Sequence, residues 1–324
     1  MKYLLNPHTD PHFNMAFDEF ALSSLAAPEP VFYLWQNRPS VIIGLNQSAY
    51  AEVNLPFLEK NGITLARRVT GGGAVYHDWG NLNYSITGPL QGMSDKEDAY
   101  LEKIVSALRR FGAPVERSGR NDILVDGRKC SGYAKRMVRD RLMIHGTLMF
   151  DVDLSTLTKV LASPGSKLSA AGIASVKSRV ANLKEYLPQF SSVKEFQAAL
   201  HKELAGDNEE IRLTEAQLTA VRLQADTKFS TWAWNYGHSP SATFLMRKKF
   251  SCGTVEAHFS LRNGCLDNIT FGGDFLGNLP AEVIAARLQG VPYRLPDLEG
   301  VLRDIGQYFD RMQPREMARF LLEG

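Results

Sequence analysis

The spacing of apolar residues along the chain predicts several amphipathic helices. Phenylalanines recur at intervals of three or four positions within residues 13–25, which is the spacing of one helix face. A capping box at residues 94–97 predicts a second helix, whose apolar stripe runs as far as Phe111. By the same reasoning, further helices are expected near 51–61, 191–205, 214–225, 280–289 and 297–312.

Short apolar runs bounded by turn residues predict β-strands. The clearest pair is 123–125 and 128–130, because Asp126-Gly127 between them is the two-residue turn most typical of a β-hairpin. Residues 166–180 are expected to form a loop. Other strands are expected at 31–35, 41–45, 63–68, 81–86 and 145–150.

A change in residue composition and in hydrophobic pattern near residue 240 predicts a domain boundary. Residues 232–240 are rich in aromatic and turn-forming residues, and beyond them apolar and polar positions alternate over 255–262, as in a half-buried strand. Because 324 residues exceed the usual size of one hydrophobic core, we expect two domains, residues 1–240 and residues 241–324.

Composition and charge are those of an ordinary globular protein. Hydrophobic residues make up 44% of the chain and charged residues 22%, and a formal net charge of +2 gives no reason to expect nucleic acid or a membrane as a partner. The three cysteines form no Cys-x-x-Cys pair, which argues against a zinc site or a disulfide framework and favours a reducing compartment. No apolar run is long enough for a signal peptide or a membrane span, so a cytoplasmic location is expected.

The most informative segment is a glycine loop preceded by two arginines, Arg67-Arg68-Val69-Thr70-Gly71-Gly72-Gly73. Glycines let a backbone approach a ligand closely and present N–H groups to an anion, and arginines offer fixed charge for a carboxylate or phosphate. The segment matches neither the Gly-x-x-x-x-Gly-Lys-Ser/Thr phosphate loop nor the dinucleotide-binding pattern. It is therefore predicted to be an anion-binding loop of another kind, and a purely structural turn is the alternative.

A second polar cluster lies around the predicted hairpin. Strand alternation places Lys129 and Ser131 on one face and Cys130 on the other, so Lys129 is predicted to aim its charge at an anionic reaction centre, with a solvated edge lysine as the alternative. Asp122 is a candidate Mg²⁺ ligand together with substrate phosphates, or else an ordinary turn residue. Cys130 is predicted to be a small buried hydrophobe rather than a nucleophile. His145 has no Ser or Cys at a spacing that supports a catalytic triad, so packing or hydrogen bonding within the sheet is expected for it.

These motifs together resemble those of lipoate–protein ligases. The similarity covers nearly the whole chain, including a tail that is similar to the accessory domain of the longer ligases. It implies an α+β fold, with a mixed β-sheet catalytic domain of the biotin/lipoate ligase type and a smaller α+β C-terminal domain. The matching segments, in the order and approximate spacing of that family, are Arg67 to Asn81, Gly119 to Asp122, Gly127 to Gly132, His145 to Leu148, Ser175 to Leu183 and Trp234 to Gly237.

The resemblance implies an ATP-dependent reaction in two steps. Lipoate is first converted to lipoyl-AMP with release of pyrophosphate. The lipoyl group then passes to a lysine of a lipoyl domain in a 2-oxoacid dehydrogenase E2 subunit, or of the glycine-cleavage H protein. ATP and Mg²⁺ are the expected cofactors, lipoate is a substrate, and the enzyme is expected to be a monomer.

The resemblance also assigns residues to each part of the site, with Lys129 as the catalytic residue and Asp122 as the metal ligand. The ATP and lipoyl-AMP site is expected to comprise Arg68, Gly73, Ala74, Val75, Tyr76, Asp122 and Lys129. The lipoate site is expected to comprise Gly71, Gly72, Gly73, His77, Lys129 and Ser131. An adenylate-binding loop that closes over the reactive intermediate is expected to include Lys167, Ser175, Lys177 and Arg179.

Other activities are compatible with parts of this pattern. An octanoyltransferase of the same fold would need an accessible, activated cysteine, and a biotin ligase would carry a Gly-Arg-Gly-Arg loop, which this sequence lacks. A homologue that only transfers preformed lipoyl-AMP and a non-catalytic lipoyl-domain binding module are the remaining alternatives. The chain departs from the family pattern at Cys130 and at Tyr133, and Tyr133 is expected to narrow the pocket.

Overall fold

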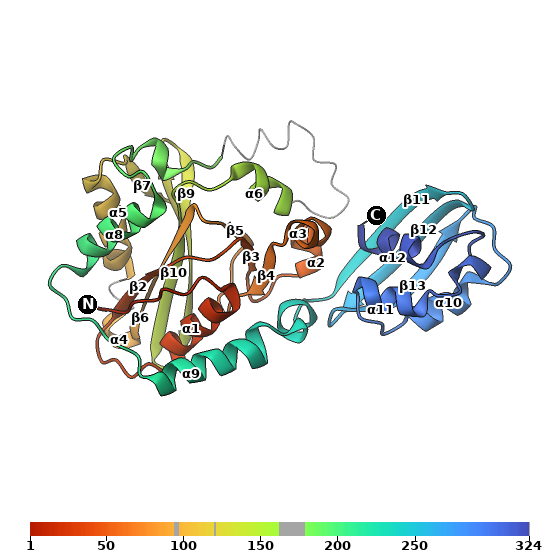
Figure 1. The fold of residues 1–324 in the computed structure, drawn as a ribbon, viewed down its shortest axis with the longest axis horizontal. Coiled ribbons are helices and arrows are strands. Elements are labelled where there is room, and N and C mark those ends of the chain that lie inside the picture. The colour runs from red at the N-terminus through yellow and green to blue at the C-terminus, as the bar shows by residue number, and fades with distance from the viewer. Residues whose placement is uncertain (94–96, 120, 162–178, 324) are drawn as a thin grey trace. The chain divides into compact units, whose positions relative to one another are not determined.

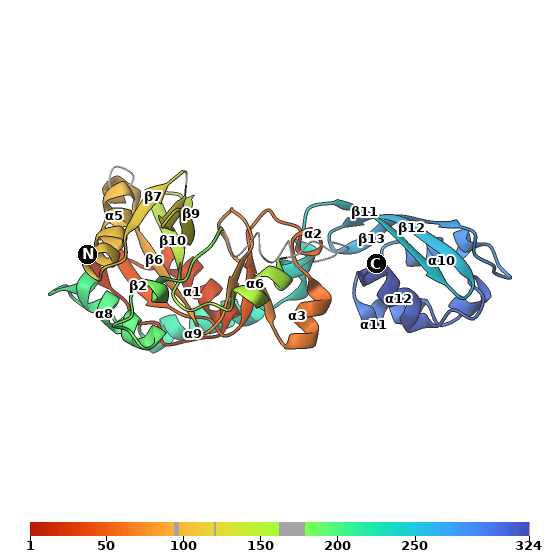
Figure 2. The ribbon, with the colours of Figure 1, turned by 90° about the horizontal axis from the view of Figure 1, so that it is seen from above.

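The computed structural model describes residues 1–93, 97–119, 121–161 and 179–323 (Figures 1 and 2). The described strands form three sheets, and helices lie between groups of consecutive strands along the chain. No helix in these ranges is long and apolar enough to cross a membrane.

The described residues form two compact units, and each unit consists of more than one segment of the chain. Among the residues that the structure describes, the first unit comprises Met1–Leu45, Asn61–Leu161 and 179–231. The second comprises Asn46–Lys60 and Trp232–Gly324, apart from residues outside the described ranges. The placement of residues 46–60 in the second unit was not expected from the sequence, and the domain boundary at residue 240 stays a prediction.

The first unit is built around a mixed seven-stranded β-sheet. Its strands lie in the order β1-β2-β6-β10-β9-β8-β7, and all neighbours are antiparallel except β1 and β2. The predicted hairpin joins β8 to β9, where Asp126 and Gly127 have φ values of 48° and 70°, as this two-residue turn requires. The strands are β1 (Lys2–Tyr3), β2 (Val31–Trp35), β6 (Asn81–Pro89), β7 (Val115–Ser118), β8 (Asp122–Val125), β9 (Arg128–Val138) and β10 (Arg141–Met149).

The two faces of this sheet carry different side chains. On β6, buried apolar residues at 82, 84 and 86 alternate with buried polar residues at 81, 83, 85 and 87. The apolar face forms a core with α5 (Glu97–Arg110) and α8 (Val193–Ala205). The polar face is covered by α1 (Pro11–Ser23), which contacts β6, β10 and α9 (Glu215–Gln224). Because buried polar groups need partners, this second face is where a polar site is expected.

A separate three-stranded sheet carries the glycine loop. Strand β3 (Ser40–Ile43) lies between β4 (Thr64–Arg67), which is parallel to it, and β5 (Val75–His77), which is antiparallel. The glycine loop joins β4 to β5. Helix α1 contacts β4 as well as the large sheet, so one helix ties the two sheets together. The other helices described in the first unit are α4 (Leu90–Met93), α6 (Leu154–Val160), the 3₁₀ helix η1 (Leu183–Glu185) and the π-helix η2 (Ala225–Phe229).

The second unit has an antiparallel sheet of β11 (Ala242–Phe250), β12 (Gly253–Arg262) and β13 (Cys265–Gly273). Its apolar core includes Tyr50, whose ring centroid lies 5.1 Å from that of Tyr293. This packing explains why residues 46–60 belong to the unit. Its helices are α2 (Ala49–Glu52), α3 (Leu55–Asn61), η3 (Ala233–Gly237), α10 (Ala281–Leu288), α11 (Leu295–Val301), η4 (Ile305–Gln307) and α12 (Pro314–Glu323).

Most predicted elements are present within a few residues of the expected bounds, but the helix predicted over 297–312 is wrong. That stretch contains the end of α11 and the short η4, and the last helix, α12, begins only at Pro314. Gly300 near the end of α11 weakens the helix there, and a proline is well tolerated in the first turn of a new one. The capping box predicted at 94–97 starts at residues outside the described ranges, so the predicted start of this helix stays a prediction; the described part of α5 runs from Glu97 to Arg110.

Candidate active site

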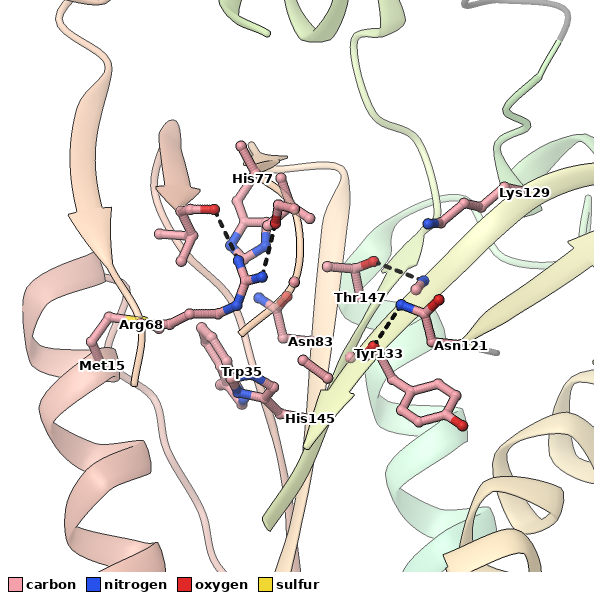
Figure 3. A pocket seen from close by; sticks show the side chains of 18 residues that line it. Met15, Trp35, Arg68, His77, Asn83, Asn121, Lys129, Tyr133, His145 and Thr147 are labelled. Carbon is pink, nitrogen blue, oxygen red and sulfur yellow. Dashed lines mark hydrogen bonds between the residues drawn. The ribbon is translucent and has the colours of Figure 1, made fainter. Parts of the chain in front are cut away.

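A cavity of about 120 Å³ lies in the first unit, and its wall includes residues of both sheets (Figure 3). The small sheet contributes the glycine loop, and the large sheet contributes side chains from β2, β6, β9 and β10. The cavity is lined by Met15, Trp35, Ile42, Arg68, Gly72, Gly73, Ala74, Val75, His77, Asn83, Asn121, Lys129, Gly132, Tyr133, Ala134, His145, Gly146 and Thr147.

Strand register brings side chains that are far apart in the sequence together at this cavity. Trp35 on β2 is directly opposite Asn83 on β6, which is directly opposite Thr147 on β10. In the next row on the same face, Ser85 is opposite His145. Directly opposed residues on one sheet face have Cβ atoms about 5 Å apart. The register of three strands therefore builds one wall of the cavity.

Arg68 holds the glycine loop in shape. Its side chain is buried and donates hydrogen bonds to the carbonyl oxygens of Ile42, Gly71 and Gly73 (3.1, 2.7 and 2.8 Å) and, through Nε, to Thr70 Oγ1 (2.9 Å). Burial lowers the pKa of Arg68 to about 10, so the guanidinium stays charged at neutral pH. The charge is thus satisfied by the backbone of the loop itself, and the expected contact between Arg68 and the nucleotide stays a prediction.

Only one of the three loop glycines adopts a backbone conformation that favours glycine. Gly72 has a φ of 92°, whereas Gly71 and Gly73 do not have positive φ, and a Cβ on either would meet no atom within 4 Å. Gly44 is required for a different reason, because a Cβ there would lie 2.1 Å from Gly72 O. The loop backbone is therefore left uncovered at Gly71 and Gly73, which suits close approach by a ligand.

Hydrogen bonds to His145 connect the loop to helix α1. His145 Nε2 lies 2.7 Å from Thr70 Oγ1, and His145 Nδ1 lies 2.7 Å from Asp18 Oδ2. Asp18 Oδ1 accepts from Tyr33 Oη (2.6 Å) and Ser85 Oγ (3.0 Å), so this buried carboxylate is held by several donors. Thr70 is buried and does not line the cavity, so this Asp–His–Thr arrangement fixes the loop rather than presenting a nucleophile.

Lys129 and Asp122 form an ion pair beside the cavity. Lys129 Nζ lies 2.7 Å from Asp122 Oδ1, and the two side chains are 39% and 34% exposed. The backbone of Lys129 donates to Arg179 O (2.8 Å) and accepts from Ala181 N (3.0 Å). Arg179, at the end of the predicted adenylate-binding loop, and Ala181 just after it are therefore anchored next to Lys129.

Lys129 and Ser131 do not share a strand face as predicted. The register between β8 and β9 shifts between Ile123 and Leu124, which makes Cys130 an extra residue in β9 and breaks the alternation. Lys129 lines the cavity, whereas Ser131 is fully buried and does not. The expected contact of Ser131 with lipoate therefore has no support from its strand position.

The prediction that Cys130 is a buried hydrophobe is confirmed. The side chain is fully buried in the apolar core, and its Sγ donates to Ile123 O at 3.4 Å. Burial raises the pKa of the Cys130 thiol to about 12. A thiol in this environment is not an activated nucleophile.

Of the twelve expected site residues that the structure describes, seven line the cavity. Gly71, Tyr76, Asp122 and Ser131 do not line the cavity, and Arg179 is exposed. Lys167, Ser175 and Lys177 lie outside the described residues. The expected residues that line the cavity are Arg68, Gly72, Gly73, Ala74, Val75, His77 and Lys129. Tyr133 also lines it, and the narrowing of the pocket by this side chain stays a prediction.

Sequence reasoning missed the polar strand face as a source of site residues. Asn83 and Thr147 line the cavity, as do Met15 and Trp35. A signal was present in residues 81–87, where Asn, Asn, Ser and Thr alternate with apolar residues. A strand with one apolar face and one face of uncharged polar residues indicates a polar interior when another element covers it.

Comparison with known families matches two parts of the chain. Residues 10–205 match the lipoyl protein ligase A/B catalytic domain, and residues 239–321 match the bacterial lipoate protein ligase C-terminus. The chain is 36% identical to lipoate–protein ligase 1 of Staphylococcus aureus over 327 residues, which cover 99% of this chain and 100% of that protein.

Solved structures of ligases are also similar to the chain. A bi-partite lipoate protein ligase from Thermoplasma acidophilum, reported with its E2 lipoyl domain, is 32% identical with a TM-score of 0.66, over 74% of this chain and 97% of that one. A lipoate-protein ligase A bound with ATP is 30% identical with a TM-score of 0.64, over 73% of this chain and 98% of that one. The chain therefore belongs to the lipoyl protein ligase A/B family, and the resemblance and the α+β fold expected from the sequence are confirmed.

Proposed function

We propose that this chain is an ATP-dependent lipoate–protein ligase. It activates lipoate to lipoyl-AMP and transfers the lipoyl group to a lysine of an acceptor protein. The observation that carries the proposal is a cavity whose wall combines the family's glycine loop with Lys129, in a chain that matches the family in both its catalytic and its C-terminal parts.

The activation step brings two anions together. A carboxylate oxygen of lipoate attacks the α-phosphorus of ATP, and pyrophosphate leaves as the bond to the β-phosphate oxygen breaks. Cations and backbone donors must offset the negative charge that gathers there. Lys129 supplies such a charge at the cavity, and its ion pair with Asp122 supports a defined position for Nζ. In the second step the amine of the acceptor lysine attacks the acyl carbon and loses a proton, and AMP leaves.

Asp122 suits a Mg²⁺ ion that is held partly by the nucleotide. No group of three or more His, Cys, Asp or Glu side chains that could hold a metal lies among the residues the structure describes. Mg²⁺ typically binds through one or two carboxylates plus substrate phosphates, and Asp122 is a partly exposed carboxylate next to Lys129. We therefore assign Asp122 as the protein ligand of Mg²⁺, which would neutralise phosphate charge when bound.

The acceptor is proposed to be the lipoyl domain of a 2-oxoacid dehydrogenase E2 subunit, with the glycine-cleavage H protein as a second acceptor. The Thermoplasma acidophilum relative, which is described together with its E2 lipoyl domain, supports the first of these. The enzyme is proposed to act as a cytoplasmic monomer. All three cysteines are free, which is in keeping with a reducing compartment.

Exchange of labelled pyrophosphate into ATP tests the activation step directly. The chain should catalyse exchange only when lipoate is present, and a purified E2 lipoyl domain should gain the mass of one lipoyl group when ATP is added. A thioester transferase, a transfer-only homologue and a binding module show no exchange. If the chain modifies the lipoyl domain from supplied lipoyl-AMP but shows no exchange, it is a transfer-only enzyme and the proposal is wrong.

A further inference from the structure

A chain of asparagine side chains leads from the N-terminal segment to His77. Asn6 Nδ2 donates to Asn14 Oδ1 (2.9 Å), Asn14 Nδ2 donates to Asn37 Oδ1 (2.7 Å), and Asn37 Nδ2 lies 3.0 Å from His77 Nδ1. All four side chains are buried. They come from the segment before α1, from α1 itself, from the residues after β2 and from β5. We refer to Asn6, Asn14 and Asn37 as the asparagine relay.

Main-chain carbonyl groups fix the direction of the asparagine relay. Asn14 Nδ2 also donates to the carbonyl oxygens of His8 and Gln36 (3.1 and 3.0 Å), and these can only accept, so the amide of Asn14 has one possible orientation. Asn14 Nδ2 has two hydrogens for these three acceptors, but a turned Asn37 amide would place two NH₂ groups 2.7 Å apart. Asn37 therefore presents its oxygen to Asn14 and its nitrogen to His77. His77 Nδ1 is consequently an acceptor, and the hydrogen of the neutral ring lies on Nε2. Burial, with the nearby positive charge of Arg68, lowers the pKa of His77 to about 3, so the ring is neutral at physiological pH.

His77 Nε2 is a buried donor that has no hydrogen-bond partner among the described residues. His77 lines the cavity, and in Figure 3 it lies toward Trp35 and Asn83, away from Lys129. The amide nitrogen of Asn83 is also unpaired. However, the hydrogen bond between Asn81 and Asn83 can also form if the nitrogen and oxygen of both amides exchange places, so the unpaired atom of Asn83 can be either a donor or an acceptor. Of these two side chains, only His77 therefore has a defined donor. A buried donor left unpaired costs free energy, which a ligand with an acceptor at this point recovers.

We propose that His77 Nε2–H donates a hydrogen bond to a ring sulfur of the lipoyl dithiolane, and that the asparagine relay keeps the imidazole in the donating tautomer. This inference rests on the proposed function, in which Lys129 receives the carboxylate end of lipoate and the dithiolane lies at the other end of the cavity. A disulfide sulfur is a weak acceptor, whereas a plain alkyl chain offers none. The site therefore selects the sulfur-containing acyl group, and octanoate leaves the donor unpaired.

The first test compares two acids of nearly the same shape. They are lipoate and its analogue in which both ring sulfurs are replaced by CH₂ groups, and their binding to the full-length chain is measured by calorimetry. The unaltered chain is expected to bind lipoate about tenfold more tightly than the analogue. His77→Met removes the donor at similar volume and should bring the two affinities within about twofold. His77→Gln retains an N–H group and should keep part of the preference.

The second test examines the tautomer itself by ¹⁵N NMR of histidine-labelled protein, with the His77 signals identified by their loss in His77→Gln. Nε2 should be protonated and Nδ1 unprotonated, and lipoate should shift the Nε2 signal where the CH₂ analogue does not. Asn37→Asp places a carboxylate, which only accepts, against Nδ1. It should move the proton to Nδ1 and abolish the preference for lipoate at a pH above the pKa of that ring. Asn208→Asp adds the same charge at an exposed position and should change neither the tautomer nor the preference.

The outcomes separate this inference from the proposed function. A chain that binds both acids equally well and still shows lipoate-dependent pyrophosphate exchange overturns the His77 assignment alone. The same holds if His77 carries its proton on Nδ1 in the unaltered chain, or if His77→Met keeps the full preference for lipoate. A chain that binds neither acid and shows no exchange overturns the proposed function, and this inference with it.

Discussion

The two units of this protein bury different kinds of side chain. In the first unit the buried residues at and around the cavity include Asp18, Arg68, His77 and His145, each held by hydrogen bonds from or to other elements. In the second unit, the residues that the structure describes bury no charged side chain, and the core is aliphatic and aromatic. Burial of charge is costly unless each group is satisfied. Buried charge is therefore concentrated around the cavity of the first unit, whereas the described core of the second unit is apolar.

Among the variants that test this difference between the two units, Lys129→Ala is expected to have the largest effect, a loss of activity. Lipoate adenylation should fall on the order of 100-fold or more, because a charge aimed at the reacting anions is lost. The free energy of unfolding should change by less than about 1 kcal/mol, because the ion pair with Asp122 is partly exposed. Adenylation is measured by pyrophosphate exchange and stability by denaturant unfolding.

Lys135→Ala is the matched control for that prediction. Lys135 lies on the same strand and pairs with Glu97 at 2.8 Å, but its side chain is 56% exposed and does not line the cavity. This variant should keep full activity. Adenylation at the normal rate by Lys129→Ala would remove Lys129 from the catalytic role.

Arg68→Ala should reduce both activity and stability, unlike Lys129→Ala. It leaves the carbonyl groups of Ile42, Gly71 and Gly73 without their shared donor, which should lower the free energy of unfolding by about 2 kcal/mol or more. A distorted glycine loop should weaken ATP binding, as measured by calorimetry. Arg303→Ala, at an exposed position of the second unit, is the control and should change neither quantity. Unchanged stability of Arg68→Ala would show that the loop keeps its shape without the guanidinium.

The polar interior of the first unit should also make its stability depend on pH through His77. Burial lowers the pKa of His77 from its ordinary value of 6.5 to about 3, so below about pH 6.5 the unfolded chain binds a proton that the folded chain does not. The resulting stability is fully present above the unfolded pKa and is lost as the pH falls toward 3. His77→Gln should reduce the pH slope of the unfolding free energy by up to about 1.4 kcal/mol per pH unit in this range. An unchanged slope in urea titrations between these pH values would mean that His77 is charged in the folded protein.

A chain that ends after Ser239 tests the second unit. From the sequence, such a chain is predicted to fold alone and to bind lipoate and ATP, with an altered balance of its two half-reactions. The structure adds that residues 46–60 would lose their packing, since Tyr50 contacts Tyr293 and donates to Gly264 O (3.4 Å). Hydrogen exchange should therefore be fast in residues 46–60 and slow in the seven-stranded sheet. Equal protection of residues 46–60 in the shortened and full-length chains would show that this segment is stable without the second unit.

Structural elements that depend on nearby residues could be predicted from the sequence. Arrangements that depend on contacts between residues far apart in the chain could not. The Asp126-Gly127 hairpin, for example, follows from the two residues of its own turn. The row of Trp35, Asn83 and Thr147 depends on the order and register of three strands that no local pattern specifies. The bulge at Cys130 and the membership of residues 46–60 in the second unit also arise from tertiary contacts. The glycine loop and Lys129 were identified because their residue types are unusual in their positions, whereas the asparagine relay consists of unremarkable residues spread along the N-terminal part of the chain.

The smallest effect is expected from Cys130→Val. Cys130 is next to Lys129 in β9, but its side chain is buried in the apolar core. We therefore expect it to contribute to stability and not to catalysis. Valine has a similar volume and suits a strand, so the free energy of unfolding should change by less than about 1.5 kcal/mol. Both half-reactions should run at rates within about twofold of the unaltered chain, because the high pKa of this thiol excludes a thiolate nucleophile.

The two half-reactions are measured separately, and intact-protein mass spectrometry is used to search the unaltered chain for an acyl adduct. A folded but inactive Cys130→Val, or an acyl group trapped on Cys130, would show that the chain transfers acyl groups through a thioester, and the ligase mechanism would have to be abandoned.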